Sequence, residues 1–381
     1  MRIGIDARFY GPHAGTGIGR YTNRLIEQLE EQDHHNEYVV FLGQGNFAYY
    51  HPAAPRFRKV LAPWKWYSFG EQSKFPALIR QQRLDFVHFL HFNVPLLSPR
   101  PFVVTVHDLI LSKFPTTRAS TLEPAFYWLK HAAYNLVIRA ALQRSARVIA
   151  VTNNTKRDIQ TNWRVAAQKI AVIYEACDVT QQLPLVSPAE LERRLGIVEP
   201  FVMYVGTAYP HKNLERLVAA LAALRQRGFK YQLVLSGRDD YFYRRLKRFV
   251  TARQLNRTGR EIVFTGYVSD EVLDALYRRA SLYVCPSIYE GFGLPGLEAM
   301  ARGTPVLASL TSSLPEVYGQ AAAYFDPYSI DDMVTVLGDL LNDEQRRREL
   351  GRRGTDRVKL FSWSKMAKET LEVYNSVGRK F

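Results

Sequence analysis

The chain has 381 residues, of which 47% are hydrophobic and 23% charged, with a formal net charge of +15. This composition excludes a disordered chain and predicts a folded protein of two or three domains. Two cysteines are too few for a disulfide framework, no segment reaches the roughly 18 apolar residues of a membrane span, and the start lacks a secretory signal, so we expect a cytoplasmic protein.

The first half of the chain alternates between strand and helix patterns. A helical spacing of apolar residues follows the first predicted strand, at residues 19–32. The predicted strands are residues 2–7, 37–43, 85–90, 101–108, 146–152 and 169–176. Such apolar, β-branched runs are typical of strands buried on both faces, and their alternation with helices predicts a parallel, doubly wound sheet.

A glycine-rich loop, AGTGIGRY, precedes the first predicted helix. Its glycines, Gly15, Gly17 and Gly19, run G-x-G-x-G after a long connection. Dinucleotide binding needs G-x-G-x-x-G on a tight turn directly after the strand, so we do not expect NAD. Such a loop either approaches a phosphate with its N–H groups or serves only as a tight turn.

The positive charge is concentrated between Arg56 and Lys169, which contain 18 Lys/Arg and 5 Asp/Glu. Four of the five tryptophans lie in the same region. It is either a solvated basic face or a surface that binds anionic lipid, with residues 62–69 and 123–142 as the segments to suspect. We expect no nucleic-acid partner, because no helix-turn-helix, zinc finger or RNA-binding aromatic signature accompanies the charge.

The strand–helix pattern restarts after the polar stretch at residues 180–196. A helical pattern covers residues 213–228. The predicted strands are residues 201–206, 231–237, 262–268, 281–287 and 304–309. Two doubly wound domains, with a boundary near residues 179–199, fit better than one large sheet. Ligands of such sheets bind at the carboxyl ends of the strands, and two facing domains would enclose a cleft.

Two glutamates, Glu290 and Glu298, bracket a glycine-rich core in YEGFGLPGLEAM. We predict a loop at Glu290 and a helix from Leu294, with Pro295 in its first turn. The first N–H groups of this helix suit an anion such as a diphosphate, and the carboxylates suit the hydroxyl groups of ribose or hexose. The alternative is that Glu298 only complements the helix dipole.

The segment EGFGLPGLE resembles the E-x7-E motif of the retaining glycosyltransferases of family 4, which have the GT-B fold. The resemblance runs from RIGIDARF at the start to FSWSKMAKETLEVYNS, which is similar to the closing helix of the family. It implies two Rossmann-like doubly wound domains facing across a cleft. The acceptor domain would be 1–182, with helix 364–381 packing back on it, and the nucleotide-sugar domain 183–363.

By this resemblance, Glu298 would hold the donor ribose and Glu290 the hydroxyls of the transferred sugar. The amides of Gly293 and Leu294 would contact the sugar or the diphosphate. The remaining motif residues of the donor site are Gly291 and Phe292.

The segment YVGTAYPHKN is similar to the first strand and loop of the family's C-terminal domain. Gly206 and Lys212 would meet the donor diphosphate there, because a cation stabilises the charge that develops on the leaving phosphate. Many members carry an arginine where this chain has Thr207. Either Lys212 acts without it, or another cation such as Arg238 contributes. The alternative for Lys212 is a solvated loop residue.

Three further positions match the family. His107 corresponds to a histidine near the sugar, although a structural role beside Asp108 is the alternative. The loop at Tyr267 and Val268 would meet the nucleobase through its backbone. The N-terminal domain would contribute Gly15, Thr16 and Gly17 to the diphosphate site.

The chain contains no D-x-D triplet, so we expect no metal and no cofactor besides the nucleotide-sugar donor. The resemblance implies retention of configuration, which we expect through front-face attack rather than a covalent intermediate. GDP-mannose is the first donor choice, since V-G-T-x-Y-P-H-K-N resembles mannosyltransferases of bacterial polysaccharide assembly. The acceptor would be a lipid-linked or cell-surface glycan, and the protein would lie peripherally on the inner face of the cytoplasmic membrane.

Three alternatives stay open. The donor could be UDP-glucose, UDP-galactose or UDP-N-acetylglucosamine. The chain could be a sugar-nucleotide epimerase of similar fold, against which the GFGLP motif argues. It could also be a basic membrane-bound partner protein with a disabled transferase site, against which the intact Glu290, Glu298 and Lys212 argue.

Overall fold

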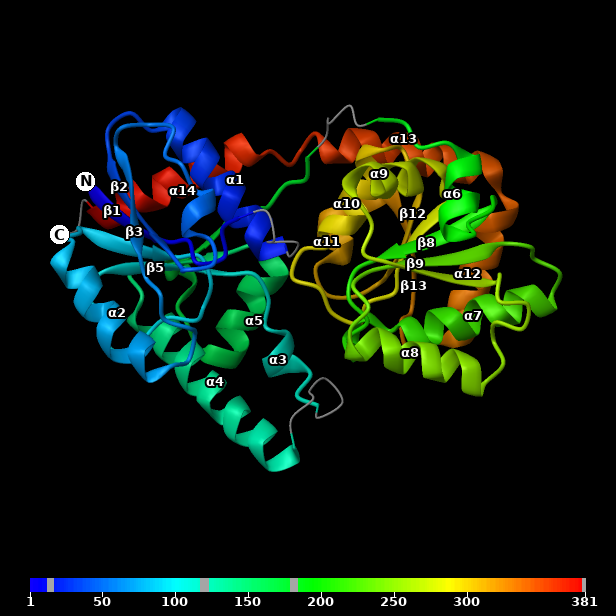
Figure 1. Ribbon diagram of the computed structural model, residues 1–381, viewed down its shortest axis with the longest axis horizontal. Coiled ribbons are helices and arrows are strands. Elements are labelled where there is room, and N and C mark those ends of the chain that lie inside the picture. Colours follow the sequence, from blue (N-terminus) through cyan, green and yellow to red (C-terminus); the bar gives the residue numbers. More distant parts are fainter. Residues whose placement is uncertain (12–16, 117–122, 179–183, 379–381) are drawn as a thin grey trace. The chain divides into compact units, whose positions relative to one another are not determined.

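A computed structural model describes residues 1–11, 17–116, 123–178 and 184–378, and of residues 124–126 only the backbone. Contacts divide the chain into two compact units (Figure 1). Unit 1 comprises Met1–Pro115, Leu122–Glu175 and Phe361–Phe381, and unit 2 comprises Thr116–Thr121 and Ala176–Leu360. Each unit is built on its own parallel sheet, which confirms the predicted α/β class.

The described part of unit 1 contains a seven-stranded sheet of order β3-β2-β1-β4-β5-β6-β7, in which every pair is parallel. Its strands are β1 (Arg2–Asp6), β2 (Glu37–Leu42), β3 (Phe57–Leu61), β4 (Phe86–Phe89), β5 (Phe102–Val106), β6 (Arg147–Ala150) and β7 (Ile170–Val172). The central strands are buried on both faces, as their apolar sequences predict.

The helices of unit 1 are α1 (Gly17–Gln32), α2 (Phe69–Gln81), α3 (Ile110–Lys113), α4 (Pro124–Arg144), α5 (Asn153–Trp163) and α14 (Trp363–Gly378), with short 3₁₀ turns at Phe47–Tyr49 and Ala167–Lys169. Side chains cap the starts of α2 and α5. The Ser68 side chain accepts a hydrogen bond from the N–H of Glu71, and the Thr152 side chain accepts one from the N–H of Thr155.

Helix α14 comes from the far end of the sequence and packs against α1. The Tyr374 hydroxyl lies 2.7 Å from Nδ1 of His88 in β4, and Nε2 of His88 lies 2.8 Å from the Thr105 hydroxyl in β5. All three side chains are fully buried. The helix therefore supplies a polar partner to the interior of the unit 1 sheet, besides apolar surface.

The described part of unit 2 contains a six-stranded parallel sheet of order β10-β9-β8-β11-β12-β13. Its strands are β8 (Phe201–Val205), β9 (Gln232–Ser236), β10 (Ile262–Gly266), β11 (Leu282–Cys285), β12 (Val306–Ser309) and β13 (Ala322–Phe325). In both sheets the strand order reverses at the first strand of the unit, which is the doubly wound arrangement.

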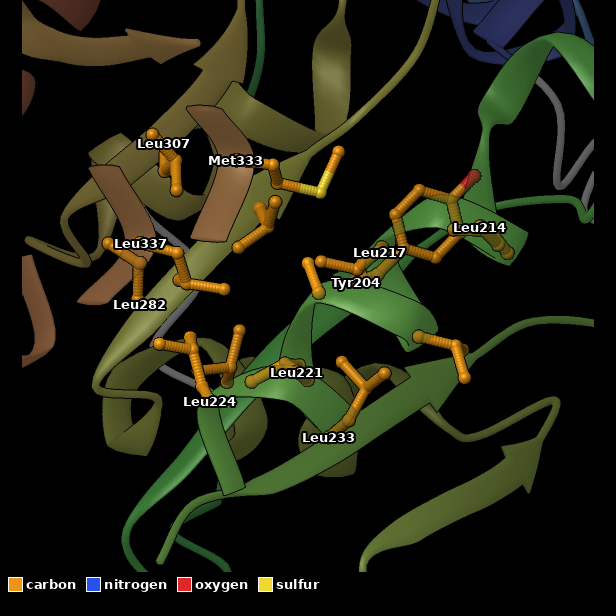
Figure 2. Packing of buried hydrophobic residues seen from close by; sticks show 14 of the residues in the cluster. Tyr204, Leu214, Leu217, Leu221, Leu224, Leu233, Leu282, Leu307, Met333 and Leu337 are labelled. Carbon is orange, nitrogen blue, oxygen red and sulfur yellow. The ribbon is translucent and has the colours of Figure 1, made fainter. Parts of the chain in front are cut away.

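The helices of unit 2 are α6 (Pro188–Leu195), α7 (Leu214–Gln226), α8 (Tyr241–Ala252), α9 (Asp270–Arg279), α10 (Leu294–Ala301), α11 (Leu314–Tyr318), α12 (Ile330–Asn342) and α13 (Glu344–Val358), with 3₁₀ turns at Pro210–Lys212 and Gly319–Ala321. Helices α7 and α12 pack together over the sheet. Figure 2 shows the leucines of α7 meeting Met333 and Leu337 of α12 and the strand residues beneath them. This core fixes the positions of β8 and β11, whose carboxyl ends carry the candidate site described below.

None of the described helices is long and apolar enough to cross a membrane.

Candidate active site

The candidate site of unit 2 lies at the carboxyl ends of β8 and β11, where each strand passes into a loop and then a helix. Asn213, with a left-handed backbone (φ 61°), directly precedes α7 and donates through its amide to the carbonyls of Pro286 and Pro327. The N–H of Ile288 donates to the carbonyl of His211 at 2.8 Å. These bonds hold the two loops together, so their side chains have fixed relative positions.

Lys212 and Glu290 form an ion pair at this junction. The Lys212 ammonium lies 2.7 and 2.9 Å from the two carboxylate oxygens of Glu290. Their side chains are 18% and 14% exposed, so both can still meet a ligand. Burial raises the pKa of the Glu290 carboxyl, but the charge of Lys212 and hydrogen bonds from Lys212 and Ser287 outweigh it and hold the pKa below its usual value.

Serine side chains hold the Glu290 loop from three directions. The Ser287 hydroxyl donates to Glu290 Oε1 at 2.6 Å. The Glu290 N–H donates to the Ser312 hydroxyl, and the Ser313 hydroxyl donates to the Glu290 carbonyl, both at 2.9 Å. The carboxylate is therefore oriented before any substrate arrives.

The start of α10 packs closely against a tyrosine. Gly293 precedes the helix with φ 96°, and no described side chain caps it. The Tyr318 hydroxyl donates to the Gly293 carbonyl at 2.6 Å. A Cβ added to Gly293 would lie 2.5 Å from the hydroxyl oxygen of Tyr318. A Cβ on Gly296, one turn into the helix, would collide with that hydroxyl. The glycines of the motif thus permit this close approach.

Gly296→Ala is therefore expected to lower the free energy of unfolding by about 2 kcal/mol, because the new methyl group must displace Tyr318. Denaturant unfolding of the purified variant measures the change. Gly45→Ala, at a position with no neighbour within 4 Å of an added Cβ, is the control. Equal stability of the two variants would contradict the proposed close packing.

Glu298 lies in α10, two residues after Gly296, and is 8% exposed. The hydroxyl of the buried Tyr277, from α9, donates to Glu298 Oε2 at 2.9 Å. Arg302 donates to the Glu298 carbonyl and pairs with Asp274 at 2.7 Å. Tyr277 therefore orients the carboxylate, which the sequence alone did not indicate.

If Glu298 binds the donor ribose, Tyr277→Phe is expected to raise the KM for the donor about tenfold with little change in kcat. The reason is that the carboxylate loses a charge-assisted hydrogen bond that fixes its orientation. Steady-state kinetics over a range of donor concentrations measures both constants. Tyr231→Phe, whose hydroxyl bonds the distant Leu341 carbonyl in the same unit, should leave them unchanged.

The other predicted donor residues of unit 2 lie on loops at the same edge of the sheet. Gly206 follows β8 and has φ 143°. The next residue, Thr207, is exposed, and its backbone carbonyl accepts a hydrogen bond from the Tyr204 hydroxyl. Arg238 follows β9 and is exposed. Tyr267, 77% exposed, and Val268 follow β10. Among the predicted donor residues of unit 2, the structure brings Lys212 and Glu290 into contact.

His107 lies in unit 1, directly after β5, and is 7% exposed. Its Nδ1 lies 2.6 Å from the Glu175 carboxylate and its Nε2 lies 2.9 Å from the Leu90 carbonyl. The ring of Tyr21 packs edge-on at 4.8 Å. Gly17 is the first residue of α1, while the predicted Gly15 and Thr16 lie outside the described residues.

Sequence reasoning did not find Tyr277, Ser287, Ser312, Ser313 or Glu175. Each acts on a predicted residue through a contact, and four of the five lie in a different element from their partner. Of these five residues, Ser287 is the one that lies close to its partner in the sequence, three residues before Glu290.

Groups of three or more His, Cys, Asp or Glu side chains that could hold a metal do not occur among the described residues.

Comparison with known families gives one match for each half of the chain. Residues 15–181 match the family described as Glycosyltransferase Family 4, and residues 190–357 match Glycosyl transferases group 1. Together the two matches cover most of the sequence.

Similar proteins include an Escherichia coli protein named O-antigen chain mannosyltransferase B. It is 29% identical over an alignment 385 residues long, which covers 94% of this chain and 96% of that protein. The MMP alpha-(1→4)-mannosyltransferase of Mycolicibacterium hassiacum is 32% identical over an alignment 289 residues long, which covers 72% of this chain and 65% of that protein. The solved structure of sucrose-phosphate synthase from Thermosynechococcus elongatus aligns over 100% of both chains with a TM-score of 0.77 at 21% identity, which shows a shared GT-B fold.

Proposed function

Because this chain belongs to the family 4 glycosyltransferases of GT-B fold, we propose that it transfers mannose from GDP-mannose to a lipid-linked or cell-surface glycan, with retention of configuration. The observation that carries the proposal is the Lys212–Glu290 pair beside the start of α10. It places a cation, a carboxylate and a helix N-terminus at the carboxyl edge of one sheet, where such sheets bind ligands.

Each group in this arrangement suits one part of a nucleotide sugar. Lys212 and the start of α10 carry the positive charge and N–H groups that a diphosphate needs. The oxygens of Glu290 and Glu298 accept hydrogen bonds from hydroxyl groups of the sugar and the ribose. Because Lys212 stabilises the charge on the leaving phosphate, we propose that no metal takes part and that activity persists in EDTA.

We propose front-face transfer, in which the leaving phosphate oxygen takes the proton of the acceptor hydroxyl. The protein then positions the reactants and stabilises charge, with Glu290 holding the sugar and Lys212 the phosphate. The choice of mannose is supported by the names of the relatives from E. coli and M. hassiacum, both called mannosyltransferases.

Calorimetric titration with GDP, UDP and ADP in EDTA, followed by the matching sugar nucleotides, tests the donor. Tight binding of GDP alone is the expected result. Preference for UDP would retain the transferase and discard GDP-mannose. Failure to bind any of the three nucleotides would overturn the proposed function.

We further propose that unit 1 binds the anionic inner face of the cytoplasmic membrane, where a lipid-linked acceptor would reside. Phe69 at the start of α2 is 86% exposed, and Trp128 and Leu129 of α4 are 51% and 68% exposed. Exposed lysines at positions 65 and 130 flank these apolar side chains. Aromatic and basic side chains together favour a membrane interface.

Flotation with vesicles of phosphatidylglycerol, compared with phosphatidylcholine, tests this proposal. The protein is expected to float with the anionic vesicles only, and Trp128→Ser with Leu129→Ser to lower the bound fraction severalfold. Tyr328→Ser, which removes an aromatic ring of similar exposure in unit 2, is the control. Equal flotation of all variants would contradict the proposed surface.

A further inference from the structure

His107 contacts acceptor atoms of the protein at both of its ring nitrogens. Nε2 faces the Leu90 carbonyl at 2.9 Å, and Nδ1 faces the Glu175 carboxylate at 2.6 Å. Glu175 is 4% exposed and follows β7 in the chain. Two strand ends and the segment after β4 therefore meet at this ring.

The positions of the protons follow from the partners. A carbonyl oxygen only accepts, so Nε2 must carry hydrogen. A neutral ring would then leave a bare Nδ1 lone pair pointing at a carboxylate oxygen, with no proton between two acceptors. One more proton relieves this repulsion, and it belongs on the ring, because imidazole is a stronger base than a carboxylate. A doubly protonated ring then satisfies both contacts.

The charged groups around the ring agree with that assignment. Burial lowers the pKa of His107, but its hydrogen bond and charge interaction with Glu175, with smaller contributions from Leu90 and Asp108, raise it above the usual value. The neighbouring His88 and His91 have pKa values lowered to about 3 by burial and by His107, so they stay neutral. Tyr21, on α1, is a buried phenol whose pKa is raised by burial.

We propose that Glu175 is a positioning residue that holds His107 as an imidazolium at neutral pH, so that His107 carries positive charge there and does not act as a general base. Both N–H groups are donated within unit 1, so the ring has no lone pair with which to take a proton from an acceptor hydroxyl.

This charge lies at the carboxyl end of β5, the edge at which ligands of such sheets bind. We infer that the positive end of this imidazolium–carboxylate pair stabilises the anionic part of a substrate bound there. This statement about a substrate rests on the proposed function. The protonation state itself does not, because it follows from contacts within unit 1.

Nuclear magnetic resonance of protein labelled with carbon-13 at histidine Cε1 tests the proposal directly. The His107 signal is assigned by its loss in His107→Gln. In the wild type its titration midpoint is expected above the ordinary histidine value of about 6.5, and in Glu175→Gln about one pH unit or more lower. Asp158→Asn, which removes a carboxylate paired with Lys113 elsewhere in unit 1, should leave the midpoint unchanged.

A wild-type midpoint at or below 6.5 would overturn the proposal, and so would an equal midpoint in Glu175→Gln. If Glu175→Gln does not fold, the titration midpoint of His107 in the wild type alone tests the proposal. Failure of nucleotide binding would refute the proposed function and leave this titration unaffected, so the two failures are distinguishable.

The pH profile of kcat/KM separates this role from simple structural support. In the wild type the contribution of His107 is present at low pH and lost as pH rises through its raised pKa. In Glu175→Gln the loss begins at lower pH, so the two profiles converge in acid and diverge near neutrality. A uniform drop in Glu175→Gln at every pH would contradict a charge-holding role.

Discussion

Replacement of Glu290 by glutamine is expected to lower kcat about a thousandfold while the protein stays folded. The amide has nearly the shape of the carboxylate but carries no charge, so its hydrogen bonds to sugar hydroxyls are weaker, and the loss falls on the transition state. The side-chain oxygen of glutamine can still accept hydrogen bonds from Ser287 and Lys212, so we expect the variant to stay folded. Single-turnover and steady-state rates with the donor identified by calorimetry measure the effect.

The same variant is expected to bind the nucleoside diphosphate as tightly as the wild type or tighter, because Lys212 no longer faces a carboxylate charge. Glu215→Gln removes a partly exposed glutamate of α7, paired with Arg245, and serves as the control for loss of a charge in unit 2. Wild-type kcat in Glu290→Gln would refute the role of Glu290 in transfer.

Replacement of Lys212 by methionine is expected to affect both activity and stability. Because the diphosphate loses its cation, kcat/KM should fall about a hundredfold or more. Because the largely buried Glu290 carboxylate loses its ion-pair partner, the free energy of unfolding should fall by about 3 kcal/mol. Denaturant unfolding and donor kinetics on the same preparation measure the two effects.

The pH dependence of stability should reverse in this variant. In the wild type the pKa of Glu290 is lowered, so its contribution to stability is present above the unfolded pKa and lost as pH falls through the folded one. Without Lys212, burial favours the protonated carboxyl, so the variant should recover part of its stability as pH falls.

The double variant Lys212→Met with Glu290→Gln completes the cycle. It should regain most of the stability lost in the single lysine variant, since no unpaired charge remains, and should stay inactive. A double variant as unstable as the single one would show that the ion pair does not cause the loss.

The sheets were largely predictable from the sequence, except for one edge strand of each sheet. The central strands are continuous apolar runs because helices cover both of their faces. Strand β3 was missed because it is an edge strand whose Arg58 and Lys59 interrupt the apolar pattern, as edge strands commonly require. Strand β13 was missed because it is a short edge strand with the alanine-rich sequence AAYF.

The candidate site was predictable only where a motif carried it. Glu290 and Glu298 lie in a recognisable segment, but the contact between Lys212 and Glu290 spans 78 residues and depends on how two loops meet. The contact between His107 and Glu175 spans 68 residues in the same way. A tyrosine such as Tyr277 has the same appearance in a sequence whether its hydroxyl orients a carboxylate or only completes the core.

The packing of α14 on α1 also determines the order of events during synthesis. Unit 1 is interrupted by Ala176–Leu360, and α14 emerges from the ribosome only after these 185 residues. At about 5–20 residues per second that takes roughly ten to forty seconds. During this time the apolar stripe of α1 that α14 will cover, and the His88 side chain that Tyr374 will meet, await their partners. The nascent chain must therefore be protected from aggregation, by chaperones or by transient contacts of its own, until α14 has emerged.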